Sequence, residues 1–285
     1  MVDYSQDNNG TGSPTDQGLL DDPAYTIEQA LNNLQQTDDP SARYYAAWWI
    51  GRFRVNEPVA IQGLLTALED NSDRSPDGGY PLRRNAAKAL GKLGDVSVVP
   101  ALIEALQCPD YYVRESAAQS LEMLGDQQAI PGLISLLNGG VAAAQQVEGK
   151  PHLIQPYEAI LEALGTLQAK NAISLIEPFV EHFVPKVKFA AARALYQLTN
   201  DPVYGEILVT ALQETTLQVR RSALMDLGAI GYLGGVDAIG NTLAENSLKL
   251  ISLKGILEHH LSQQEMPQEL NDDLVHLMNV MDSLL

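Results

Sequence analysis

One segment recurs along the chain, and its repetition restricts the fold more than any other feature of the sequence. Each copy places paired alanines or other small residues ahead of a leucine or isoleucine, as in ARYYAAWWIGRF from Ala42 and LRRNAAKALGKLG from Leu82. With the residue after the first apolar one counted as position zero, the copies start at Arg43, Arg83, Arg114, Ile154, Lys188, Arg220 and, more weakly, Lys249. The step is just over thirty residues, with about ten residues inserted twice. A fixed period of this length predicts a stack of similar structural units.

Each unit contains two amphipathic helical patterns joined by a short turn. The second pattern, as in PVAIQGLLTALED and SVVPALIEALQ, has apolar residues at helical spacing and Gly, Asp, Asn or Pro at its ends. Strand signals are nearly absent, and one helix pair cannot bury its own apolar side, so the pairs must stack. We therefore predict an all-α fold, an α-solenoid of about six to seven helix-pair repeats that forms a right-handed superhelix with a concave binding face. The A-A-x-A-L-G core resembles short HEAT-like repeats, and this resemblance implies that the alanine-containing helices line the concave face.

The rest of the chain is organised around this solenoid, which we predict to span residues 23–285 as one domain. Residues 1–22 are polar and acidic and are predicted to form a disordered tail. Two Gly-rich segments, at about 71–81 and 138–152, predict inserted loops. Residues 258–285 are predicted to form capping helices.

The charge and the cysteine content exclude several classes of partner and site. A formal net charge of −18 repels phosphate backbones and anionic lipid, so we expect no nucleic-acid partner and no membrane insertion. Cys108 is the single cysteine, which rules out an internal disulfide and favours a reducing compartment. We see no signal peptide and expect a cytoplasmic protein.

The repeats indicate which helix positions face outward. Positions +3, +4 and +7 are small or apolar in most units and predict a buried stripe. Positions +1, +5 and +8 follow the same spacing on the opposite side and are mostly polar or charged in other units. In the first unit they are Tyr44, Trp48 and Gly51. Trp49 and Phe53, at +6 and +10, are expected in the core.

Two interpretations of Tyr44 and Trp48 follow. Terminal repeats are often atypical, so the preceding helical segment TIEQALNNLQ is one element that would cover these rings as a cap. The other interpretation is an exposed platform for a partner protein or a planar ligand.

Basic residues cluster beside this aromatic segment. The arginines at position zero are expected to pair with an acid or a carbonyl of the adjoining turn, because a buried guanidinium needs partners. Arg52, Arg54 and Arg84 are less well explained by that role and are suited to bind carboxylates.

No known catalytic motif is present. G-x-S-x-G, P-loop, G-x-G-x-x-G and H-E-x-x-H patterns are all missing, the histidines are scattered, and we expect no metal site. Cys108 has no histidine near it in sequence and is expected to be a packed thiol. Tyr111 and Tyr112 resemble Tyr44 and Tyr45, and are either a wedge between repeats or a ligand contact.

Long stretches of the chain carry a closer resemblance. The segments RYYAAWWIGRFRV, DYYVRESAAQSLEMLGD and KPHLIQPYEAILEALGTL, among others between about Ile27 and Leu257, resemble the E subunits of the E/F-type phycobilin lyases. The resemblance implies a cyanobacterial protein that forms a heterodimer with a related F-type subunit. It implies that the pair attaches phycocyanobilin by a thioether to a cysteine of the apo-phycocyanin α-subunit, which supplies the thiol. Phycocyanobilin is then a substrate, and no tightly bound cofactor is expected.

The chemistry of a linear tetrapyrrole with two propionates guides the choice of site residues. Aromatic rings can stack on its pyrroles, and arginines can bind its propionates. The candidate bilin-binding residues are Tyr44, Tyr45, Trp48, Arg52, Arg83, Arg84, Tyr111 and Tyr112. Glu115 is the candidate for a carboxylate that holds the pyrrole N–H groups and favours thiol addition.

Two alternative functions remain open. The first is the E subunit of the lyase-isomerase that acts on phycoerythrocyanin. The second is a non-catalytic HEAT scaffold that presents the apo-phycobiliprotein, in which case the exposed aromatic residues belong to the interface with the F subunit.

Overall fold

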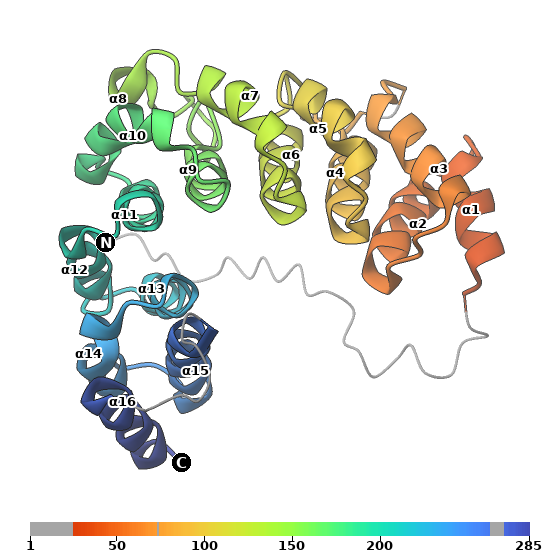
Figure 1. Ribbon diagram of the computed structural model, residues 1–285. Coiled ribbons are helices and arrows are strands. Elements are labelled where there is room, and N and C mark those ends of the chain that lie inside the picture. The colour runs from red at the N-terminus through yellow and green to blue at the C-terminus, as the bar shows by residue number, and fades with distance from the viewer. Residues whose placement is uncertain (1–24, 73, 263–270) are drawn as a thin grey trace, which may run out of the picture.

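The protein is a two-layered arc of helices. The computed structural model describes residues 25–72, 74–262 and 271–285, and the predicted tail lies outside these ranges. Within them the chain forms seven helix pairs, and Figure 1 shows an inner layer along the concave side and an outer layer along the convex side. The predicted all-α solenoid is confirmed, and the alanine-containing helices form the inner layer.

The helices alternate between the two layers along the chain. The inner helices are α2 (Pro40–Phe53), α4 (Pro81–Leu93), α6 (Tyr111–Leu124), α9 (Tyr157–Thr166), α11 (Pro185–Thr199), α13 (Leu217–Ile230) and α15 (Asn246–Ser262). The outer helices are α3 (Pro58–Glu69), α5 (Val99–Ala105), α7 (Ile130–Ser135), α10 (Ile173–Ile176), α12 (Pro202–Ala211), α14 (Val236–Asn241) and α16 (Asp272–Ser283). Helix α1 (Ile27–Gln35) precedes the first pair, and α8 (Gly140–Ala143) lies in the second inserted loop. Short 3-10 turns are η1 (Val96–Val98), η2 (Gln127–Ala129), η3 (Lys170–Ala172), η4 (Glu177–Glu181) and η5 (Leu233–Gly235).

Local sequence signals set the ends of these helices. Asp39 and Asp110 accept backbone N–H groups at the N-termini of α2 and α6, which satisfies donors that lack intrahelical partners. Gly94 and Gly125 end α4 and α6 with positive φ angles of 77° and 71°, a conformation that glycine adopts at little cost.

The predicted buried stripe forms the core. Positions +3, +4 and +7 of the first three units are fully buried: Ala46, Ala47, Ile50, Ala86, Ala87, Leu90, Ala117, Ala118 and Leu121. Trp49 packs against this core, as predicted. The prediction for Phe53 is wrong, because its side chain is 60% exposed. Since α2 is the first inner helix, no earlier inner helix covers the side that carries Phe53.

Close glycine contacts define how neighbouring inner helices pack and correct the repeat register. A Cβ on Gly51 would lie 2.8 Å from Cα of Ala89, so position +8 of one unit is a buried contact with position +6 of the next and not an outward position. Gly165 makes the equivalent contact with Ala194, at 2.6 Å. This contact places position zero of the fourth unit at Tyr157 and not at Ile154. The inserted loop had shifted the alignment by three residues.

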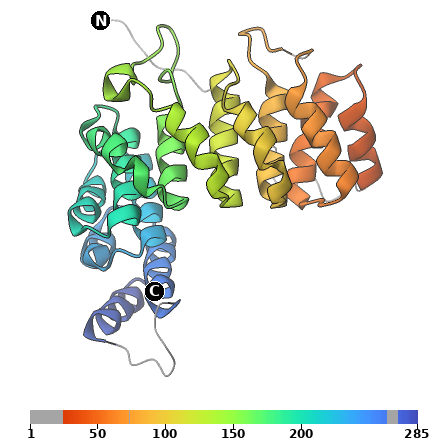
Figure 2. The ribbon, with the colours of Figure 1, turned by 45° about the horizontal axis from the view of Figure 1, so that its top comes forward.

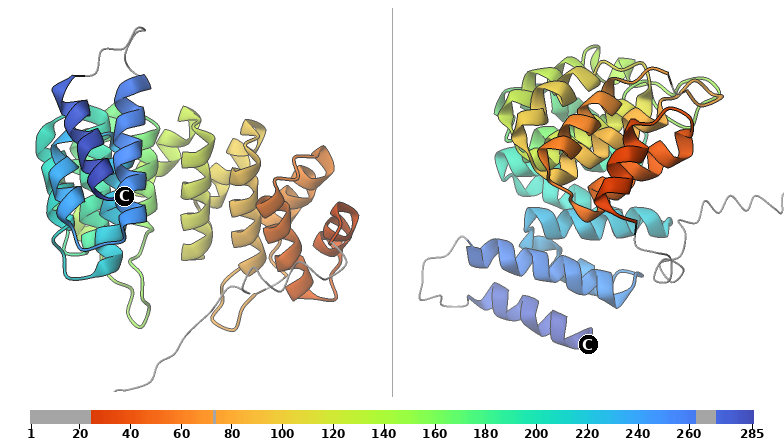
Figure 3. Two further views of the ribbon diagram at one scale, coloured as in Figure 1. Left: turned by 90° about the horizontal axis from the view of Figure 1, so that it is seen from below. Right: turned by 90° about the vertical axis from the view of Figure 1, so that its right-hand side faces the viewer.

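The two inserted loops project from the same edge of the solenoid (Figure 2 and Figure 3). The second loop contains α8 and an isolated antiparallel bridge between Gln146 and Leu153. At the other end, the predicted boundary at residue 258 lies within α15. In the described ranges, no helix is long and apolar enough to cross a membrane.

Candidate functional site on the concave face

The aromatic residues of α2 cover the N-terminal end of the inner layer. Tyr25 lies edge-on to Tyr45 and Trp49, with ring centroids 5.1 and 5.4 Å away. Trp48 lies 5.4 Å from Tyr45 and is 40% exposed. In later units the side corresponding to Trp49 carries a small residue such as Ala89, packed on the preceding inner helix. Trp49 and Tyr45 therefore fill the place of a missing helix, whereas Tyr44 and Trp48, at +1 and +5, belong to the concave face.

Three of the four arginines at position zero bind an acid or carbonyls of the turns between units, as predicted; the fourth, Arg83, donates to an amide side chain instead. Arg43 donates to the carbonyl of Leu34 and pairs with Asp70 at 2.6 Å. Arg114 donates to the carbonyls of Cys108, Pro109 and Ile154. Arg220 in the sixth unit likewise donates to three turn carbonyls. Cys108, beside this network, is buried and packed.

Of the remaining candidate arginines, Arg83 is hydrogen-bonded within the protein, whereas Arg84 and Arg52 can contact a ligand. Arg83 donates to the Asn71 side chain at 2.9 Å and lies over the ring of Tyr80, so its guanidinium is directed to the first inserted loop. Arg84 lies over the ring of Tyr112 at 5.0 Å and takes part in no ion pair with a described residue. Arg52 is exposed at the end of α2.

A second aromatic cluster joins α6 to the second inserted loop. Tyr111 stacks face to face on His152, with centroids 4.1 Å apart and planes 13° apart, and Tyr112 packs edge-on to both rings. Burial, followed by the charges of Glu115 and Glu158, raises the pKa of the Tyr111 phenol, which therefore stays protonated. The structure thus brings Arg84, Tyr111, Tyr112 and Glu115 to one part of the concave face, separate from the α2 aromatics.

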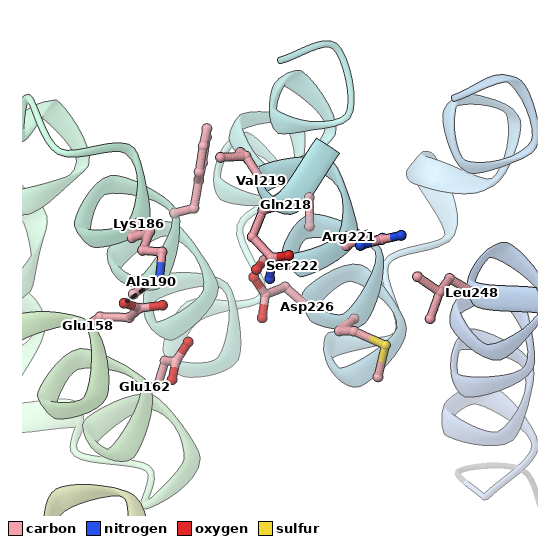
Figure 4. Close-up of a pocket in the computed structure, with 13 residues that line it drawn as sticks. Glu158, Glu162, Lys186, Ala190, Gln218, Val219, Arg221, Ser222, Asp226 and Leu248 are labelled. Carbon is pink, nitrogen blue, oxygen red and sulfur yellow. Dashed lines mark ion pairs between the residues drawn. The ribbon is translucent and has the colours of Figure 1, made fainter. Parts of the chain in front are cut away.

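An ion cluster that the sequence had not revealed lies farther along the concave face. Arg193 on α11 pairs with Asp226 at 3.2 Å, Glu122 at 3.4 Å and Glu162 at 3.6 Å. These carboxylates come from α13, α6 and α9, so one guanidinium connects four inner helices. Glu158 pairs with Lys186 at 3.8 Å at the edge of the same region. Figure 4 shows Glu158, Glu162 and Asp226 pointing into one opening.

Carboxylates outnumber cations in this cluster, and the pKa values of two of these carboxylates are raised. Burial raises the pKa of Glu162 to about 8; Arg193 opposes this shift, and the charges of Asp226, Glu158 and Glu122 add to it. Burial also raises the pKa of Asp226 to about 6. At neutral pH, Glu162 is therefore mostly a neutral acid, which can donate a proton or a hydrogen bond.

The concave face changes character along its length. On α4, Arg84 and Lys88 form a basic strip, and burial followed by the charge of Arg84 lowers the pKa of Lys88. On α9, the equivalent positions +1 and +5 are Glu158 and Glu162. At these positions the face is thus aromatic at α2, basic at α4 and acidic at α6 and α9, which carry Glu115, Glu158 and Glu162.

Three hollows follow one another along this surface. The rim hollow, of about 710 Å³, lies between the inserted loops and is lined by Arg74, Lys150 and His152 among others. The middle pocket, of about 310 Å³, shares Tyr111, Tyr112 and His152 with the rim hollow. The acidic pocket, of about 370 Å³, shares Glu158 and Lys186 with the middle pocket. The three hollows therefore adjoin one another from the loop edge to the concave face.

The acidic residues escaped prediction for a specific reason. With Ile154 as position zero, Glu158 falls at +4 in the buried stripe and Glu162 at +8. With the register set by Gly165, they occupy the outward positions +1 and +5. The signal in the sequence was Gly165 itself, at the same position as Gly51 and Gly91 in their units.

Comparison with known proteins agrees with this architecture. A family model described as PBS lyase HEAT-like repeat matches residues 42–70, and a model of HEAT repeats matches residues 74–147. Phycocyanobilin lyase subunit alpha from Synechocystis sp. is 65% identical over 92% of this chain and 97% of its own length. A solved structure of the complex of CpcE and CpcF of phycocyanin lyase from Nostoc sp. superposes with a TM-score of 0.85 at 58% identity, covering 96% of this chain and 100% of that chain.

A more distant relative bears on the lyase-isomerase alternative. Bilin biosynthesis protein PecE from Nostoc sp. is 41% identical over 87% of this chain and 92% of its own length. The identities therefore favour the phycocyanobilin lyase subunits over the alternative. The chain belongs to the family of phycocyanobilin lyase alpha subunits.

Proposed function

We propose that this chain, together with an F-type partner subunit, attaches phycocyanobilin through a thioether to a cysteine of the phycocyanin α-subunit. Family membership supports the reaction, and the name of the solved relative, a complex of CpcE and CpcF, supports the heterodimer. The relatives are cyanobacterial, and we propose the cytoplasm as the compartment. The thiol comes from the acceptor protein, so the lyase has to bind, orient and activate the bilin.

The change from aromatic to basic to acidic side chains along the concave face is the observation that supports a bilin-binding site there. A bilin has anionic propionates, flat pyrrole rings and N–H donors, and each of these needs a different protein surface. Arg84, with Arg52, is available for the propionates as a charge-assisted donor. Tyr44 and Trp48 are proposed to stack on one end of the tetrapyrrole, and Tyr45, whose ring lies 5.4 Å from Trp48, is proposed to contribute at the edge of this platform. Arg83 is the weakest of the basic candidates, because it must leave Asn71 to reach a ligand.

The carboxylates of the concave face make the bound bilin more electrophilic. Tyr111 and Tyr112 line the middle pocket together with Glu115 and Glu158. A carboxylate there can accept the pyrrole N–H groups and stabilise a protonated bilin, which attracts a thiolate more strongly. Holding the bilin in one conformation also fixes which carbon is attacked, a proximity effect.

Reconstitution tests this function. The chain is mixed with its F-type partner, apo-phycocyanin α-subunit and phycocyanobilin, and covalent attachment is measured by zinc-induced fluorescence of the α-subunit. We expect colour only when both subunits are present, and its loss with Trp48→Ala. Phe53→Ala is the matched control, since this exposed ring lies on the same helix but at position +10, away from the concave positions +1 and +5.

The outcomes separate the two functions considered. Colour without this chain contradicts a role in attachment. Colour lost with Trp48→Ala because the heterodimer dissociates, as seen by gel filtration, would make the α2 aromatics a subunit interface and this chain a scaffold.

A further inference from the structure

His152 lies at the junction of two hollows. Its ring lines both the rim hollow, which opens between the two inserted loops, and the middle pocket on the concave face. A reactant that reaches the concave pocket through the loop edge therefore passes this imidazole. The proposed reaction needs such a route, because its nucleophile is carried by another protein.

The hydrogen bonding of His152 leaves one ring nitrogen available as a base. Nδ1 lies 2.8 Å from the carbonyl oxygen of Leu153. A carbonyl can only accept, so Nδ1 carries the proton and Nε2 carries the lone pair. No described residue hydrogen-bonds to Nε2. The stack on Tyr111 fixes the ring plane, so the basic nitrogen has a defined direction.

The other histidines are unsuited to this role, and all of them lie in described parts of the chain. His182 is buried with both ring nitrogens bonded, to the Ala144 carbonyl and the Val184 N–H. His260, on α15, hydrogen-bonds through Nε2 to the carbonyl of Gly231 at the end of α13. His276 pairs with Asp237 in the outer layer. His259 lies against Gly231 on the same helix as His260.

We propose that the rim hollow admits the acceptor cysteine and that His152 is the general base for its thiol. This inference rests on the proposed function. Nε2 takes the proton from sulfur, and the thiolate forms the S–C bond at the ring-A ethylidene carbon of the bilin. The π pair moves to the adjacent ring carbon, which receives the proton back from the imidazolium. S–H is thereby added across the double bond, and no further reactant is needed.

The groups around the ring fit a transient imidazolium. Glu115 and Glu158 line the middle pocket on one side, and Lys186 also lines it. Lys150 and Asp77 line the rim hollow on the other side, one from each inserted loop. The thiolate and the imidazolium thus form near both cationic and anionic side chains, while the raised pKa of Tyr111 keeps its phenol neutral.

The test is the rate of attachment by the heterodimer carrying His152→Asn, which retains an amide donor for the Leu153 carbonyl but lacks a base at Nε2. With saturating phycocyanobilin at neutral pH, we expect the rate to fall by about 100-fold or more, the usual contribution of a general base. The deficit should shrink at pH 9, where the acceptor thiol ionises unaided, and imidazole in solution should restore part of the rate. His276→Gln is the matched control and should be unchanged.

Each result decides the point. An unchanged rate, or a loss that is the same at every pH and is not restored by imidazole, overturns the base assignment. Failure of the unsubstituted heterodimer to attach bilin would instead refute the proposed function. Bilin absorption and gel filtration verify that His152→Asn still binds bilin and its partner; if it does not, His152→Gln is assayed in the same way.

Discussion

Replacement of Arg193 by methionine is the perturbation that most sharply tests the packing of the concave face. The guanidinium is 17% exposed and pairs with three carboxylates, from α6, α9 and α13. In a solenoid each unit normally contacts only its neighbours, yet Arg193 reaches Glu122 across the intervening helix α9. Removing one side of a buried ion cluster leaves uncompensated charge, at a cost of about 3 kcal/mol. We expect that loss in the free energy of unfolding at pH 8.

The pH dependence separates this explanation from a simple loss of packing. At pH 5, Glu162 and Asp226 bind protons, because their pKa values are raised to about 8 and about 6. The repulsion left by Arg193→Met is then smaller, and so is the destabilisation. Urea denaturation followed by circular dichroism measures both values. Lys254→Met, which breaks an exposed pair with Glu258, is the control and should cost less than about 0.5 kcal/mol. An Arg193→Met effect no larger than the control, or larger at pH 5 than at pH 8, would refute the reasoning.

Two further perturbations test the acid cluster and the helix contacts. Because folding raises the pKa of Glu162 from 4.5 to about 8, the contribution of this carboxyl to stability is fully present at low pH and is lost as the pH rises through 8. Glu162→Gln should remove a fall on the order of 3 kcal/mol between pH 5 and pH 8, measured by urea unfolding, and an identical fall in both proteins contradicts the burial of this carboxyl. Gly51→Ala should destabilise the protein by about 1–3 kcal/mol, because the new Cβ meets the backbone of Ala89 at 2.8 Å. Thermal unfolding measures it, and an unchanged midpoint excludes the contact.

The fold could be predicted because its determinants are local and repeated. Paired alanines at +3 and +4 allow close helix approach, and the same spacing in each unit makes the buried stripe visible without coordinates. The inserted loops were visible as glycine-rich interruptions. Phe53 was misplaced because helical spacing alone does not show that α2 lacks a preceding inner helix.

The site could be predicted only in part, for reasons of distance and register. Tyr111 and Tyr112 were visible as a pair, but His152 joins them from a loop 41 residues beyond Tyr111. Glu122 and Arg193 are 71 residues apart and in units that do not adjoin, so no repeat pattern relates them. Glu158 and Glu162 were concealed by a three-residue shift of the alignment, which the packing of Gly165 against Ala194 corrects.

The most direct test of the central claim is a titration of the heterodimer with phycocyanobilin, followed by the absorption of the bilin. The claim is that the concave face of this chain holds the bilin, with Arg84 at a propionate. Arg84→Gln should then weaken binding by about 10- to 100-fold, since a hydrogen bond to a charged group contributes about 1.5–3 kcal/mol. Lys170→Gln, on the outer layer, should bind as the unsubstituted protein does. Equal affinity of Arg84→Gln and the unsubstituted heterodimer would contradict the role of Arg84, and equal affinity of Trp48→Ala as well would place the bilin on another surface.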